Sequence, residues 1–451
     1  MSPPPTTRGG RGAAAQGPAP TMERRLHPRP PPDHLRHPSA GAARALGLGL
    51  ITGAADDDPV AIGTYANAGA SFGPAVLWLA PALLPMMAII VFLASKLGRV
   101  AGQGLAAVIK LHYPRWILWS VVVAVVVGNT IEAGADLGGV AAAINLLLPV
   151  KIGLIVPPLA TGILAVQVFG SYIGMRNLFR WLALALLAYV GAAALAHPQL
   201  AQVARATVLP HLQWNRHYLA MLVAIIGTAL SPYLYVWQVS QEVEEDISMG
   251  RRRLSDRQGA TAAELKKTLW DVLAGMVFDV VVMYFIMLST AAALYPAAWG
   301  SLHTAAEAAA ALKPLAGAAA GALFAVGVVA VGLLAIPVMT VGAAYVVCDA
   351  LGWKSGLSAR PKDARPFYLV IAATTAAATA FNYLGFNPIH ALVGAGIVQG
   401  CLAPALMLLL LQMTNNRQIM GRWTNSRPAN LLGALTLLLA TAAVAALAAT
   451  L

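Results

Sequence analysis

Three consecutive carboxylates followed by a proline, Asp56, Asp57, Asp58 and Pro59, are the residues whose types and spacing most clearly predict chemistry. They fall in the middle of an apolar segment, 42–72, that is long enough to span a bilayer. A carboxylate at bilayer depth costs at least ~2.5–3.5 kcal/mol, so it must face a cavity or a partner. Proline removes a backbone donor and interrupts a helix. A broken span that carries acids is typical of a cation site near the middle of a secondary transporter.

A second interrupted span lies five helices further along the chain, where Gly227 and Pro232 break the apolar segment 217–246. Paired breaks at matching places in two halves indicate an inverted repeat, and the unwound carbonyls at the breaks can coordinate a cation. A simple kink would explain Pro232 alone, but its pairing with the first break favours a functional reading. The alternative for the first break is an acidic turn outside the bilayer. It is disfavoured because 45–55 and 60–73 are each too short to span alone.

Polar residues in the third predicted span could complete such a site. Asn129, Glu132 and Asp136 stand at i, i+3 and i+7, so they share one face of a helix. We expect Glu132 to reach a metal-bound water and Asp136 to lie along the inner path. The alternative for each acid is a buried structural network, and the same alternative applies with more force to Asp279, which is alone in the middle of its span.

The elements that must position these residues are membrane helices. Of 451 residues, 59% are hydrophobic and 11% are charged, far from the roughly 25% charged residues of a soluble domain. Residues 1–40 are rich in Pro, Arg, Gly and Ala and predict a disordered tail without a signal-peptide pattern. The two cysteines form no CxxC motif or zinc spacing, so neither a disulfide framework nor a zinc site is indicated.

Apolar segments predict eleven spans. They are 42–72, 75–96, 116–148, 152–170, 177–196, 217–246, 265–295, 316–350, 367–386, 388–414 and 428–451.

The basic residues predict the orientation of these spans. With this count, 26 of the 30 lysines and arginines lie on the side of the N-terminal tail, and the other side holds only Lys151, Arg205, Arg216 and Lys313. By the positive-inside rule the N-terminus is cytoplasmic and the C-terminus is outside. The net charge of +12 is therefore explained by the basic residues of the cytoplasmic loops, and nucleic acid is not an expected partner.

After residue 40 the chain resembles the Nramp divalent-metal transporters over nearly its whole length. In the first half of the chain the likeness is carried by Gly47-Leu48-Gly49-Leu50 with Asp58-Pro59, Leu97-Gly98-Arg99-Val100-Ala101-Gly102, Tyr113-Pro114-Arg115 and Ala135-Asp136-Leu137-Gly138-Gly139. In the second half it is carried by Ile226-Gly227, Pro232 and Thr414-Asn415-Asn416-Arg417-Gln418-Ile419-Met420-Gly421. The resemblance implies an all-α, LeuT-type 5+5 inverted repeat with helices 1 and 6 broken, plus an eleventh helix. The expected domains are 1–40 (tail), 41–196 (first repeat), 197–415 (second repeat) and 416–451 (cytoplasmic loop and helix 11).

The metal-binding positions depart from the family pattern. Asp58 matches the family's aspartate, but Ala61 stands where its asparagine is expected and Ser231 where its methionine is expected. Thr228 takes the position that lends a backbone carbonyl, and Asp136 is the family-like acid of helix 3, which makes Glu132 an additional one. These changes resemble the Nramp-related magnesium transporters. Loss of a soft thioether favours hard ions, and small side chains leave room for the waters that Mg²⁺ retains.

Two further departures concern protons and helix 10. Tyr233 and Gln238 stand at the family's two proton-linked histidine positions, so we expect transport without proton coupling. Leu402 stands at the usual helix 10 glutamine, although Gln399 lies about one turn earlier.

These observations predict a plasma-membrane secondary transporter that imports hydrated divalent cations, Mg²⁺ first and also Mn²⁺. The expected metal-site residues are Asp58, Asp57, Ala61, Thr228, Ser231, Glu132 and Asp136. The expected partners are the metal substrate and the bilayer, with no cofactor and no obligatory protein partner. The alternatives are an Nramp-type Mn²⁺/Fe²⁺ proton symporter, an Al³⁺ transporter and, more weakly, a Na⁺-driven organic-solute carrier. An enzyme is disfavoured because no nucleophile–base pair or two-histidine metal motif occurs in a span.

Overall fold

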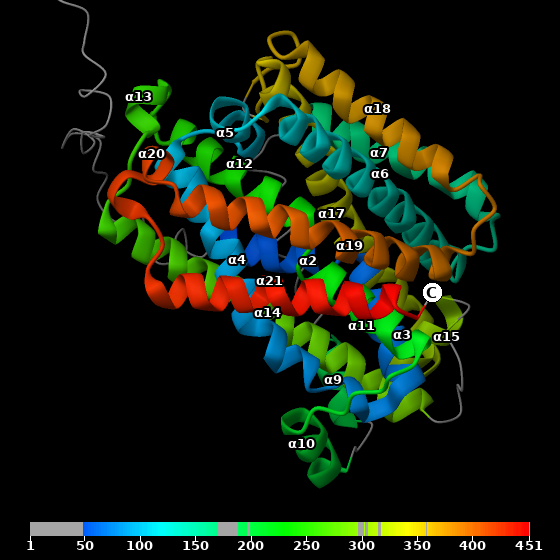
Figure 1. Cartoon of the computed structure of the whole chain (residues 1–451). Helices are drawn as coiled ribbons and strands as arrows, with labels where there is room; N and C mark the ends of the chain where they lie inside the picture. The colour runs from blue at the N-terminus through cyan, green and yellow to red at the C-terminus, as the bar shows by residue number, and fades with distance from the viewer. Residues whose placement is uncertain are drawn as a thin grey trace, which may run out of the picture.

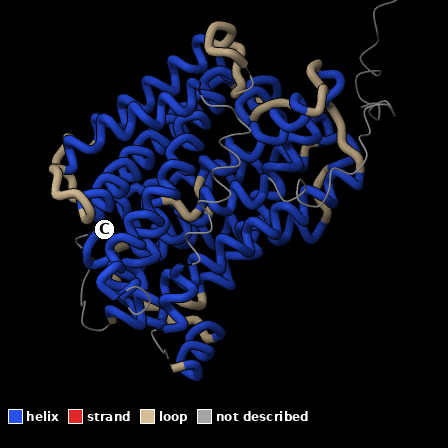
Figure 2. The backbone as a smooth tube through the Cα atoms, turned by 180° about the vertical axis from the view of Figure 1, so that it is seen from behind, coloured by secondary structure: helices blue, strands red, loops and turns tan. Residues whose placement is uncertain are grey.

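A computed structural model of the chain describes residues 48–169, 188–195, 199–295, 302, 305–313, 317–357 and 359–450. These residues form helices joined by short loops, and no strand occurs among them (Figure 2). The tail expected at 1–40 and most of the predicted span 177–196 lie outside the described residues, and only α9 (Ala188–Leu195) of that span is described.

The first and sixth spans are broken, as predicted. The first consists of α2 (Leu48–Asp56) and α3 (Pro59–Phe72), and the sixth of α11 (Arg216–Ala229) and α12 (Pro232–Ser248). In both spans the second half begins with proline at its first helical position, where the missing N–H costs nothing and the fixed φ suits a helix start.

Unbroken helices account for the other predicted spans except 177–196, which is described only in part. They are α4 (Leu79–Ala101), α6 (Arg115–Asn145), α7 (Ile152–Phe169), α14 (Ala262–Leu294), α17 (Ala320–Leu351), α18 (Arg365–Phe381), α19 (Pro388–Asn415) and α21 (Arg427–Ala448). Among the described residues, eight helical segments are long and apolar enough to cross a membrane, with α11 and α12 counted as one. The chain is therefore a multi-pass membrane protein.

Short elements lie outside the long helices. They are α5 (Leu105–His112), α10 (Leu200–Val208), α13 (Leu254–Arg257), α15 (Ala305–Ala309) and α20 (Arg417–Met420), with 3₁₀ turns η3 (Gly73–Val76), η5 (Ala310–Leu312), η6 (Gly317–Ala319) and η7 (Gly421–Trp423).

Close backbone contacts bring the broken helices into the centre of the molecule. A Cβ atom added to Gly53 of α2 would lie 2.2 Å from the carbonyl oxygen of Gly275 in α14. One added to Gly227 of α11 would lie 2.0 Å from the carbonyl oxygen of Gly396 in α19. Only glycine permits these approaches. Both breaks are consequently held inside the bundle, with α2, α3 and α11 enclosed by longer helices (Figure 1).

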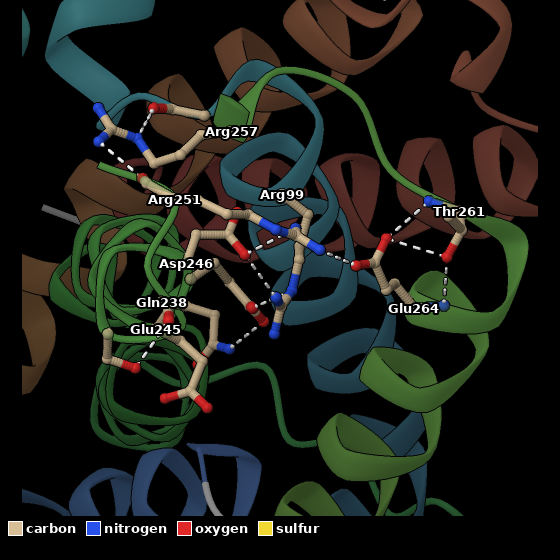
Figure 3. A network of polar contacts seen from close by, with 11 residues as sticks. Arg99, Gln238, Glu245, Asp246, Arg251, Arg257, Thr261 and Glu264 are labelled. Atoms are coloured by element: carbon tan, nitrogen blue, oxygen red, sulfur yellow. Dashed lines mark hydrogen bonds and ion pairs between the residues drawn. The ribbon is translucent and has the colours of Figure 1, made fainter. Parts of the chain in front are cut away.

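A buried ion network fixes the second half of the sixth span at its far end. The Arg99 side chain of α4 contacts Glu242 at 2.5 Å and Asp246 at 3.1 Å, both on α12 (Figure 3). Arg251 then joins Asp246 at 3.0 Å to Glu264 at 2.6 Å, near the start of α14. Glu242 and Asp246 are both buried in this network.

Candidate cation site

Asp58 lies in the break between α2 and α3, and its side chain is 1% exposed. Its Oδ1 accepts a hydrogen bond from the Ala61 backbone N–H at 2.7 Å, which makes it the N-cap of α3. The positive end of a helix dipole stabilises a carboxylate at this position. Its other oxygen, Oδ2, accepts a hydrogen bond from the Tyr233 hydroxyl at 3.1 Å. The aspartate therefore keeps its place without a basic partner.

Tyr233 connects the two breaks. It is the second residue of α12, immediately after Pro232, and its hydroxyl also lies 2.9 Å from the carbonyl oxygen of Ala55 in α2. One phenol thus contacts both halves of the first span, donating to one acceptor at a time. Sequence reasoning placed Tyr233 at a histidine position and did not include it among the site residues. Its position next to the helix 6 proline was the signal that could have identified it.

Hydroxyl groups occupy the second break. The Ser231 hydroxyl lies 2.7 Å from the Gly227 carbonyl oxygen and 3.0 Å from that of Thr228, and it is within 3.4 Å of Glu132 Oε1. The Thr228 hydroxyl donates to the Ile225 carbonyl at 3.0 Å. These contacts satisfy carbonyls that the end of α11 would otherwise leave without partners. The break is lined by oxygen atoms of hydroxyl and carbonyl groups.

The acids of α6 reach both breaks. Asp136 Oδ1 accepts a hydrogen bond from the Val60 backbone N–H at 2.9 Å, while its Oδ2 has no hydrogen-bond partner within the described structure. Glu132 approaches Ser231 through one oxygen and accepts a hydrogen bond from the Gln399 amide through the other. The structure therefore brings Glu132, Asp136 and Ser231 to the same region as Asp58. Gln399, noted from sequence only as an offset glutamine, belongs to this group.

Asn129, which shares the α6 face with these acids, turns its amide away from them. Its Nδ2 donates to the Met339 carbonyl of α17 at 2.9 Å. It therefore hydrogen-bonds to the neighbouring span and to no described residue of either break.

Asp56, Asp57 and Asp279 form a second group of buried acids beside the first break. All three are fully buried, Asp279 lies close to Asp56 and Asp57, and no other residue in the described part of the chain donates a hydrogen bond to their carboxylate oxygens. Asp57 is one of the metal-site residues expected from the sequence. The capping role belongs to Asp58, and Asp57 lies beside the site.

No group of three or more His, Cys, Asp and Glu side chains in the described structure could hold a metal ion alone. A cation bound to Asp58 would therefore complete its coordination with carbonyl oxygens, hydroxyl groups or water. These are hard ligands, suited to Mg²⁺ or Mn²⁺.

Two helices broken at prolines, meeting around a buried carboxylate in an all-helical membrane protein, define a secondary transporter of the LeuT type. The chain matches the family model described as "Natural resistance-associated macrophage protein-like" (Nramp) over residues 49–450. It belongs to this family, and so to the transporters and not the enzymes. The match confirms the family resemblance and leaves the magnesium-transporter branch as a hypothesis.

Two divalent metal cation transporters align with this chain over nearly its full length. The chain is 26% identical over 404 residues to the divalent metal cation transporter MntH of Klebsiella pneumoniae, covering 87% of this chain and 92% of that protein. It is 28% identical over 424 residues to MntH of Burkholderia ambifaria, covering 88% and 89%.

Solved structures confirm the fold. The manganese transporter of Eremococcus coleocola superposes with a TM-score of 0.67 at 18% identity, covering 90% of this chain and 87% of that one. The transporter MhsT, solved with L-phenylalanine, superposes with a TM-score of 0.55 at 11% identity, covering 92% and 99%. Similarity at these identities establishes the fold and says nothing about the substrate.

Proposed function

We propose that this protein moves divalent metal cations across a membrane and that Asp58 is their direct carboxylate ligand. The observation that carries the proposal is the position of this buried carboxylate, in a helix break, without any basic partner in the described structure. Such a charge is costly at bilayer depth and persists where a cation or a cavity compensates it. The divalent metal transport stated in the names of the MntH relatives agrees with this assignment.

The proposed ion is a hydrated one, Mg²⁺ first and also Mn²⁺. Ala61 contributes only a methyl group, and Ser231 contributes a small hydroxyl. Thr228 coordinates the ion through its backbone carbonyl. Glu132 and Asp136 accept hydrogen bonds from water molecules bound to the ion, and Asp57 adds negative charge nearby. Mg²⁺ is commonly held by one or two carboxylates while it keeps several waters.

The proposed transport needs no coupled proton. Tyr233 and Gln238 occupy the positions where histidines are linked to proton movement, and both are engaged in buried hydrogen bonds. Tyr233 donates toward Asp58 and Ala55, and Gln238 Oε1 accepts from the Thr52 hydroxyl at 2.6 Å. Neither side chain titrates near neutral pH as histidine does.

The repeat boundaries at 41–196 and 197–415, the loop and last helix at 416–451, and a cytoplasmic N-terminus in the plasma membrane are part of the same proposal. They are supported by the paired breaks and by the distribution of lysine and arginine.

Uptake by purified protein in liposomes tests the substrate assignment. Equal concentrations of Mg²⁺, Mn²⁺, Fe²⁺ and Ca²⁺ are supplied outside, and accumulated metal is measured by mass spectrometry. We expect Mg²⁺ and Mn²⁺ to accumulate above protein-free liposomes, and excess Mg²⁺ to compete with Mn²⁺. Uptake of Fe²⁺ and Mn²⁺ without uptake of Mg²⁺, and without competition by it, would contradict the hydrated-ion proposal and favour an ordinary Nramp symporter.

A further inference from the structure

An apolar groove of about 340 Å³ opens at the end of the molecule where α4 and α11 begin and α21 ends. Its walls come from three different spans. Leu83 and Met86 lie on α4, Ile226 on α11, and Ala442 and Ala446 on α21. The groove is separate from the cation site, and its volume falls within the range of ligand pockets, roughly 300–1,000 Å³.

The position of the groove on membrane-spanning helices indicates that it contacts lipid. All three walls belong to helices that are long and apolar enough to cross a membrane, and α21 passes in front of α4 and α11 in Figure 1. The hollow arises because α21 presents alanines, Ala442, Ala443 and Ala446, where larger side chains would fill the space. A concave apolar surface on spanning helices contacts lipid hydrocarbon, and an acyl chain fits this composition.

The aromatic residues at the open end of the groove are typical of the membrane interface, where lipid head groups lie. Trp78, Trp214 and Tyr218 line this end of the groove; Trp214 is 80% exposed, whereas Tyr218 is buried. Tryptophan and tyrosine concentrate at membrane interfaces because one end is apolar and the other is wet. The nearby helix α10 exposes Leu200 and Val208, as expected of a helix lying in the interface.

A positive charge lies close in sequence to the lining residues at this end of the groove. Arg216 is the first residue of α11, lies between the lining residues Trp214 and Tyr218, is exposed, and forms no ion pair within the described structure. Asn215 caps the helix by accepting from Tyr218 N–H at 2.8 Å, and the first-turn N–H groups before it lack intrahelical acceptors. A cationic side chain at a helix N-terminus attracts phosphate.

We propose that this groove binds one phospholipid, with an acyl chain between α21 and the pair α4 and α11 and its phosphate at Arg216. The exposed arginine between Trp214 and Tyr218 and the apolar walls on membrane-spanning helices favour a lipid over a peptide or a second protein copy. The bound lipid would support the last span against the first half of the broken sixth span.

Native mass spectrometry of the purified protein tests the assignment. Palmitoyl-oleoyl phosphatidylglycerol, the same lipid with a choline head group, and palmitoyl-oleoyl glycerol without phosphate are titrated separately. We expect one tightly retained phosphatidylglycerol or phosphatidylcholine, and weaker retention of the lipid without phosphate. Equal retention of all three lipids would overturn the role of the phosphate.

Two pairs of variants separate the chain contact from the head-group contact. The double variant Ala442→Phe with Ala446→Phe fills the groove. It should lower the affinity for the phospholipid by roughly tenfold or more, because each CH₂ group of the acyl chain that is no longer buried weakens binding. Ala445→Phe, exposed on the same helix but outside the groove, should leave binding unchanged. Arg216→Gln should weaken both phospholipids by roughly fivefold and leave the phosphate-free lipid unaffected, whereas Arg205→Gln on α10 should change nothing.

Unchanged lipid retention in the groove-filling variant would overturn the proposal. A dimer that this variant abolishes, with no retained lipid in the parent protein, would reassign the groove to a contact between two copies. Metal uptake is recorded in parallel, so that failure of the lipid site is distinguishable from failure of the cation site.

Discussion

Asp58 has a structural role and a proposed binding role at once. Its carboxylate caps α3 through Ala61 N–H and accepts a hydrogen bond from the Tyr233 hydroxyl. Around it the side chains are short or hydroxylated, and Glu132 is oriented by Ser231 and Gln399. Hard oxygen ligands and limited side-chain volume are the basis for predicting a hydrated ion.

At this scale Glu132→Gln tests the role of the second carboxylate. The substitution keeps the volume and removes the charge that would face a water bound to the ion. We expect Mg²⁺ uptake to weaken by ~10–100-fold, the usual effect of an outer contact to a metal site. Transport rates over a range of Mg²⁺ concentrations give the measurement, and rates equal to those of the parent protein would remove Glu132 from the site.

The double variant Ser231→Met with Ala61→Asn tests selectivity. It restores a soft thioether and an amide and fills space available to water. We predict loss of Mg²⁺ uptake and higher affinity for Mn²⁺ or Cd²⁺. Calorimetric titration with each metal measures the affinities, and a thermal-unfolding control establishes that the protein is intact. Unchanged selectivity would mean that these two positions do not determine ion choice.

Among the elements, α2 depends on its contact with α14. Gly53 and Gly275 meet backbone to backbone, and a Cβ on Gly53 would overlap the carbonyl of Gly275. We predict that Gly53→Ala lowers the unfolding temperature and metal uptake. The control is Gly162→Ala in α7, where the added Cβ has no atom within 4 Å. There the lower entropy of the unfolded chain should make the substitution neutral or slightly stabilising. Equal stability of both variants would contradict the close contact.

The broken spans could be predicted because local sequence causes them. Pro59 and Pro232 stop one helix and start the next, and Asp58 is a natural N-cap for the second. Residues that meet across helices were harder to predict. Gln399 reaches Glu132 only because α19 and α6 pack at one particular depth, which no local pattern encodes. The helices α5 and α10 were not predicted because they are too short to give a spanning signal.

The whole molecule presents a buried site between spans that move as units in this fold class. The ion network from Arg99 to Glu264 ties α12 to α4 and α14, so the second half of the broken sixth span should move together with these helices. In the proposed orientation, with a cytoplasmic N-terminus, an inside-negative potential would drive a divalent ion inward with ~4.6 kcal/mol per 100 mV, twice the value for one charge.

Coupling is a property of the whole transport cycle, and we predict none to protons. A pH-sensitive dye is enclosed in proteoliposomes with a potential set by a K⁺ gradient, and metal influx is followed at the same time. Mg²⁺ or Mn²⁺ should enter without acidification of the lumen, because Tyr233 and Gln238 replace titratable histidines. Acidification that tracks metal entry and disappears in an Asp58 variant would return the protein to the symporter alternative.

The most direct test of the central claim is metal uptake by Asp58→Asn. Asparagine is as good an N-cap as aspartate, so the variant should keep the α3 start and the fold while losing the charge that faces the ion. Asp363→Asn, an exposed acid in the turn before α18, is the control. We predict that Asp58→Asn abolishes Mg²⁺ and Mn²⁺ uptake at an unchanged unfolding temperature, while Asp363→Asn transports like the parent protein. Near-normal uptake by well-folded Asp58→Asn would contradict the account and place the cation site elsewhere.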